Sequence, residues 1–158
     1  MMNKKNNNRI LLVDNEPDIA LAFKIGLEDN GFVVDAFNDP ELASANFKDG
    51  LYDLLLLDIK MPKMNGIEFY QRMKEIDKKV KVCFITASEI HYYEKITKEL
   101  LPTLGARRLI KKPIKIEDLV KDLKQELEFV NDNNNNDHNN YKSYTQHNNH
   151  AATIFGKK

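Results

Sequence analysis

Five short apolar runs alternate along the chain with longer segments of helical periodicity. The runs cover 9–13, 32–37, 52–58, 80–87 and 107–111, and the helical segments cover 16–31, 39–50, 66–77, 88–106 and 116–130. This alternation predicts a parallel β-sheet whose strands are joined by right-handed crossover helices. Within the third run, the leucines 54–57 leave no polar position, which is typical of a strand covered by helices on both faces. We therefore predict a doubly wound α/β fold with a five-stranded parallel sheet.

Local signals mark the expected ends of several helices. Pro17 suits the first turn of the first helix, and Asn30 with Gly31 supplies its end. Pro102 and Gly105 lie late in segment 88–106 and predict that its helix is broken there.

Both ends of the 158-residue chain are rich in asparagine. Such tracts bury too little apolar surface to offset the entropy lost on ordering. We expect a disordered segment at 1–8, one folded domain at 9–130 and a disordered Asn-rich tail at 131–158. No second domain is expected after Val130, so no DNA-binding or catalytic output is expected there.

The 24 basic and 24 acidic side chains balance, which gives no reason to expect nucleic acid or an anionic membrane as a partner. No apolar run approaches the length of a membrane span. The single cysteine, Cys83, excludes an internal disulfide framework, fits a reducing compartment and is expected in the core. The chain is therefore expected to be soluble and cytoplasmic.

Polar residues follow four of the five predicted strands. They are Asp14, Asn15 and Glu16 after the first, Asp58 at the end of the third, Thr86, Ala87 and Ser88 after the fourth, and Lys111, Lys112 and Pro113 after the fifth. In an open parallel sheet, ligands bind beyond the carboxyl ends of the strands. Carboxylates, an amide, hydroxyls and an ammonium at that edge suit a hard divalent cation together with a phosphoryl group.

The motifs ILLVDNEPDI, LLLLDIKMPKMNGIEFYQRMK, FITAS and IKKPI, in this order and spacing, resemble the receiver domain of two-component response regulators. The resemblance covers about residues 9–130 and implies the flavodoxin-like strand order 2-1-3-4-5. It implies that Asp58 accepts a phosphoryl group, that Thr86 bonds a phosphoryl oxygen and that Lys112 pairs with the same group. It also implies Mg²⁺ as the cofactor. The implied metal site consists of Asp14, Asn15, Asp58 and the backbone carbonyl of Lys60.

These residue types make chemical sense independently of the resemblance. A carboxylate can attack phosphorus once the repulsion between the two anions is removed, and Mg²⁺ and Lys112 would remove it. In the loop after Asp58, Pro62 restricts the backbone and Gly66 is expected to let it turn into the next helix.

The resemblance implies a histidine kinase or a phosphotransfer protein as donor. It implies a downstream protein that binds the face formed by the fourth helix, fifth strand and fifth helix. The protein would be a monomer or a weak dimer. It would be a phospho-acceptor rather than an enzyme, with at most self-catalysed phosphotransfer and autodephosphorylation.

Three positions depart from the family pattern. Asn15 stands where the family normally has a second acid, which should lower Mg²⁺ affinity. Leu109 stands where many members have an aromatic residue that moves during signalling. Lys60 lies where members tune the lifetime of the acyl phosphate. The segment between Thr86 and Lys112 is also longer than usual.

Simpler interpretations stand beside these roles. Asp58 can be a turn residue, Asp14 a helix cap and Thr86 an ordinary strand residue. Solvent exposure is the default for most members of the basic cluster, which comprises Arg107, Arg108, Lys111, Lys112 and Lys115, and only Lys112 has the Pro113 neighbour of the family pattern. A metal-binding tail would use His138, His147 and His150, although their spacing is loose. Tyr92 and Tyr93 can mark a partner surface or simply lie on an amphipathic helix.

Two other functions stay open from the sequence. The first is a protein-interaction module of the same architecture that works without phosphorylation. The second is a flavin- or nucleotide-binding protein, for which no Gly-rich phosphate loop follows the first strand.

Overall fold

The computed structural model describes residues 8–87 and 89–129. These residues form a five-stranded parallel sheet in the order β2-β1-β3-β4-β5, as expected. The strands are β1 (Arg9–Val13), β2 (Val33–Phe37), β3 (Leu54–Asp58), β4 (Lys81–Thr86) and β5 (Leu109–Lys111). The helices are α1 (Pro17–Asp29), α2 (Pro40–Asn46), α3 (Gly66–Ile76), α4 (Ile90–Lys95), the π-helix η1 (Ile96–Leu100), α5 (Leu101–Leu104) and α6 (Ile116–Glu128).

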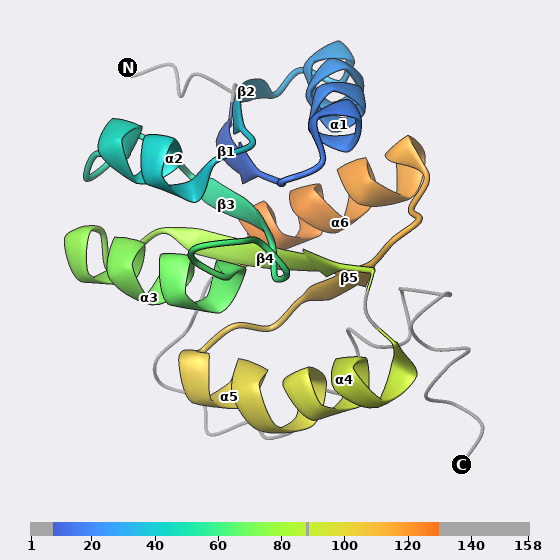
Figure 1. Ribbon diagram of the computed structural model, residues 1–158. Coiled ribbons are helices and arrows are strands. Elements are labelled where there is room, and N and C mark those ends of the chain that lie inside the picture. The colour runs from blue at the N-terminus through green and yellow to red at the C-terminus, as the bar shows by residue number, and fades with distance from the viewer. Residues whose placement is uncertain (1–7, 88, 130–158) are drawn as a thin grey trace.

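Two hydrophobic cores lie on the opposite faces of the sheet, where Figure 1 shows α1 and α6 on one side and the remaining helices on the other. Leu54 and Leu56 join the core under α1 and α6. Leu55 and Leu57 join the core under α2, α3 and the α4–α5 region. Alternate side chains of a strand point to opposite faces, so the unbroken leucine run serves both cores.

Helix α1 has the ends that its sequence predicts. Pro17 occupies its first turn, and the chain leaves it through Asn30 and Gly31, which has φ +91°. Only a residue without a Cβ adopts that backbone conformation at little cost.

The predicted break at Pro102 is wrong, because the chain stays helical from Ile90 to Leu104. The π-helix η1 precedes the proline, and the N–H of Leu101 bonds the carbonyl of Ile96, five residues back. Pro102 follows this wider turn directly, and the local shift of the backbone pairing in η1 lets the helix continue past the proline. Gly105, with φ +68°, ends the helix.

Residues 1–7, Ser88, Val130 and the Asn-rich tail with its three histidines lie outside the described residues. The domain limits and the disorder of the ends therefore stay predictions. Within the described part of the chain, no helix has the length and apolar character needed to cross a membrane.

Candidate functional site

The predicted site residues lie at the carboxyl end of the sheet. Asp58 is the last residue of β3 and Thr86 the last of β4, and both are buried. The N–H of Ile59 bonds the carbonyl of Ile85 at 2.9 Å, and the N–H of Lys112 bonds that of Thr86 at 2.8 Å. These backbone bonds carry the sheet pairing one step past the strands, so residues far apart in sequence meet at one edge.

The ammonium of Lys112 is shared by three carboxylates. Its Nζ lies 2.7 Å from Asp14 Oδ2, 3.2 Å from Asp58 Oδ2 and 3.5 Å from Glu16 Oε1. Lys112, Asp14 and Asp58 are all buried. The structure thus brings Asp14, Asp58 and Lys112 together, as expected, and adds Glu16.

Burial and charge set the protonation of the site. Burial raises the pKa of Asp58 to about 6; the charge of Lys112 opposes this rise and that of Asp14 adds to it. Burial acts to lower the pKa of Lys112, but its bond to Asp14 and the charge of Asp58 outweigh burial and raise that pKa. Near neutral pH the site therefore holds an ionised carboxylate beside a firmly protonated ammonium.

The amide of Asn15 faces two acceptors. With its nitrogen turned inward, it donates to the carbonyl of Lys60 at 3.2 Å and to Asp58 Oδ2 at 3.1 Å. The hydrogen-bonding partners assign this orientation, because both neighbours can only accept. A carboxylate oxygen and a backbone carbonyl oxygen thus converge on one point.

This donor set fits Mg²⁺, which prefers oxygen ligands. One oxygen of each of Asp14, Glu16 and Asp58 lies within 4.8 Å of the others, and the Lys60 carbonyl and Asn15 amide adjoin them. Sequence reasoning noted Glu16 after the first strand but left it out of the metal site. The clue was its place two residues after Asp14, whose Oδ1 accepts the N–H of Glu16 at 3.0 Å.

Gly66 begins α3, where the loop turns into the helix, as the sequence predicts, but the left-handed conformation is not the reason for a glycine there. Its φ is not positive, and the left-handed residue of the loop is Lys63, with φ 70°. Gly66 is needed because a Cβ there would overlap the carbonyl oxygen of Asp58. It also anchors the loop, since its N–H bonds the carbonyl of Ile59 at 3.0 Å.

Two other residues of the basic cluster form ion pairs with carboxylates of α6. Arg108 is buried and lies 3.0 Å from Asp122, and Arg107 lies 2.7 Å from Glu126. The default of solvent exposure is therefore wrong for Arg108, because α6 supplies buried carboxylates beside it.

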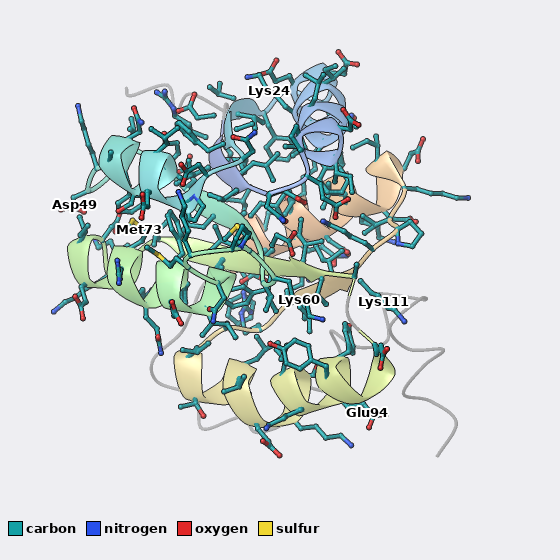
Figure 2. All side chains as sticks on the ribbon, viewed as in Figure 1. Lys24, Asp49, Lys60, Met73, Glu94 and Lys111 are labelled. Atoms are coloured by element: carbon teal, nitrogen blue, oxygen red, sulfur yellow. The ribbon has the colours of Figure 1, made fainter. Side chains whose placement is uncertain are left out.

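The two tyrosines of α4 contact residues near the site: Tyr92 contacts Lys60, and Tyr93 contacts Leu109. The ammonium of Lys60 sits 5.3 Å from the ring centroid of Tyr92, which is 39% exposed, and Figure 2 shows Lys60 between the sheet and α4. Tyr93 is 2% exposed, and its hydroxyl donates to the carbonyl of Leu109 at 3.0 Å. Its suggested place on a partner surface is therefore wrong, whereas Tyr92 is accessible.

The model of the response regulator receiver domain matches residues 10–124. The chain is 33% identical over 122 residues to the response regulator receiver protein CpdR of Brucella abortus, covering 75% of this chain and 96% of CpdR. It is 34% identical over 116 residues to the transcriptional regulatory protein DltR of Streptococcus agalactiae, covering 73% of this chain but only half of DltR.

Solved structures agree with this match. A CheY-like receiver domain protein from Methanospirillum hungatei superposes with a TM-score of 0.68 at 26% identity, covering 77% of this chain and 94% of that one. The response regulator TrrA of Thermotoga maritima, solved with Mg²⁺ and BeF, has a TM-score of 0.63 at 31% identity, covering 75% of this chain and 97% of TrrA. With its fold, strand order and motifs in agreement, the chain belongs to the response regulator receiver domain family of two-component systems.

Proposed function

We propose that Asp58 accepts a phosphoryl group from a phosphohistidine on a kinase or a phosphotransfer protein. The observation that carries the proposal is the contact of one buried ammonium, Lys112, with both Asp58 and Asp14. A buried cation beside a carboxylate at a strand end is the arrangement that an anionic phosphoryl group requires. The family match and the strand-end position of Asp58 support the same role.

In the transfer, an oxygen of Asp58 attacks the phosphorus atom and forms a new O–P bond. The P–N bond of the donor breaks, and its electron pair stays on the imidazole nitrogen. Lys112 offsets part of the charge on the phosphoryl oxygens, and the hydroxyl of Thr86 donates to one of them. Mg²⁺ held by Asp14, Asn15, Asp58 and the Lys60 carbonyl would supply the remaining positive charge. The raised pKa of Asp58 suits a nucleophile that is still ionised at neutral pH.

The signal would leave the site through the face formed by α4, β5 and α6, where a downstream protein binds. The contact between Lys60 and Tyr92 supports this route, because it joins the loop after Asp58 to an exposed residue of α4. A phosphoryl group on Asp58 would compete with the Tyr92 ring for the Lys60 ammonium. Because Leu109 has no ring to move, we propose that α4 carries the change.

The test is to incubate the protein with Mg²⁺ and a small acyl-phosphate donor and to measure its intact mass. We expect one added phosphoryl group on the wild type and on an Asp49→Asn control, which alters an exposed loop carboxylate. Asp58→Asn should gain none. If neither the small donor nor a phosphorylated histidine phosphotransfer protein labels the wild type, the proposal fails, and an interaction module independent of phosphorylation takes its place.

A further inference from the structure

Glu16 brings a third carboxylate to the site. Its side chain is 54% exposed, yet its Oε1 lies only 3.5 Å from Lys112 Nζ. Its backbone N–H is bonded to Asp14 Oδ1, so the residue is held at the mouth of the site. Three carboxylates, those of Asp14, Glu16 and Asp58, thus surround the one ammonium of Lys112. When all three are ionised, the group has two more negative charges than positive charges.

That excess charge is unfavourable for a phosphoryl acceptor by itself. A carboxylate a few ångströms from Asp58 repels an incoming phosphoryl group, which is also an anion. The repulsion is removed if the carboxylate binds a cation that the phosphoryl group also contacts. The position of Glu16 is therefore better explained by a role toward the cation than toward the phosphoryl group.

Asn15 gives the reason why such a ligand is needed. Its NH₂ group points at the place where Asp58 Oδ2 and the Lys60 carbonyl converge. To ligate a cation there, the amide must turn over and present its oxygen, which carries no net charge. One negative charge is then missing from residue 15, and Glu16 is the adjacent residue that can restore it.

We propose that Glu16 is a carboxylate ligand of the cation, directly or through one water, and supplies the charge that Asn15 lacks. This inference rests on the proposed function only for the identity of the cation, Mg²⁺. It assigns Glu16 a binding role, with no part in the making or breaking of the phosphoryl bond.

A double-mutant cycle tests the proposal by Mg²⁺ titration calorimetry at constant ionic strength, without a phosphoryl donor. We expect Glu16→Gln to weaken Mg²⁺ binding on the order of tenfold, and Asn15→Asp to tighten it. In the Asn15→Asp background, the effect of Glu16→Gln should fall below about threefold, because residue 15 then carries the charge. Asp18→Asn is the matched control, since it removes an exposed carboxylate of α1 outside the cluster and should change the affinity about twofold at most.

Several outcomes would overturn the inference, once circular dichroism shows that each variant is folded. These are a wild type that does not bind Mg²⁺, equal effects of Glu16→Gln and Asp18→Asn, or equal effects of Glu16→Gln in both backgrounds. Phosphorylation of Asp58 with Mg²⁺ affinity independent of Glu16 would keep the proposed function and overturn this inference. If Mg²⁺ binding depends on Glu16 but the protein accepts no phosphoryl group, this inference is kept and the proposed function is overturned.

Discussion

Replacement of Gly66 by alanine tests how the acceptor is held in place. Gly66 is the first residue of α3, and a Cβ there would overlap the carbonyl oxygen of Asp58. The same Cβ would lie 3.0 Å from the carbonyl carbon of Asp58 and 3.1 Å from the Cα of Ile59. All three are backbone atoms, so no side-chain rotation can relieve the overlap.

Helix propensity and packing predict opposite signs for this change. Propensity by itself favours alanine over glycine within a helix by about 1 kcal/mol. Ordinary carbon contacts begin at roughly 3.5 Å, so the backbone of Asp58 has to move by about half an ångström or more. Overpacking of this kind costs about 1–3 kcal/mol. Because the overpacking cost equals or exceeds the propensity gain, we expect Gly66→Ala to lower the free energy of unfolding by up to about 2 kcal/mol.

The same shift should slow phosphorylation. Displacement of a reacting group by about 1 Å costs roughly a hundredfold in rate, so a smaller shift of Asp58 should cost about tenfold. Urea unfolding would measure stability, and intact mass against time would measure phosphorylation by a small donor.

Gly26→Ala is the control, because the atoms nearest to its added Cβ belong to the side chain of Ile116 in α6 and not to the backbone of Asp58. Its phosphorylation rate should equal that of the wild type. The reasoning is refuted if Gly66→Ala is at least as stable as the wild type and is phosphorylated at the same rate.

Three further predictions follow from other contacts. Lys60→Ala should change the rate at which phosphorylated Asp58 loses its phosphoryl group, because the backbone N–H of Lys60 bonds Asp58 Oδ1 and its ammonium lies over the Tyr92 ring of α4; decay curves of intact mass identical to those of the wild type would contradict this. Lys81→Met should lower stability by about 1–2 kcal/mol and speed hydrogen exchange in the last turn of α6, because the Lys81 ammonium donates to three carbonyls there at 2.7–3.0 Å; unchanged exchange would exclude that role. Burial of Asp35 opposes its ionisation, but hydrogen bonds from Tyr52 and Arg9 outweigh burial and lower the pKa of Asp35. Its contribution to stability is therefore present above the unfolded-state pKa of about 3.9 and is lost as pH falls through the lower folded-state pKa. The advantage of the wild type over Asp35→Asn in urea unfolding should shrink below about pH 4, and a constant advantage would refute the assignment.

The order of apolar and helical segments was enough to predict the parallel sheet. An unbroken leucine run between helical segments is typical of a strand with a helix layer on each face, and the two cores confirm this prediction. The sequence also predicted that Asp14, Asp58 and Lys112 meet at one edge of the sheet, because each follows a predicted strand and parallel strands bring their carboxyl ends to the same edge. Periodicity and position along the chain were sufficient for these conclusions.

Tertiary structure decided the features that depend on contacts between distant segments. Tyr93 is buried because its hydroxyl meets β5, and Arg108 is buried because α6 offers Asp122. The need for a glycine at residue 66 comes from the backbone of Asp58, eight residues earlier, rather than from its own turn. Residue type and local pattern do not specify such contacts, because they arise only when the packed helices fix the distances between side chains. For the same reason, only the folded chain shows Glu16 beside the shared ammonium of Lys112.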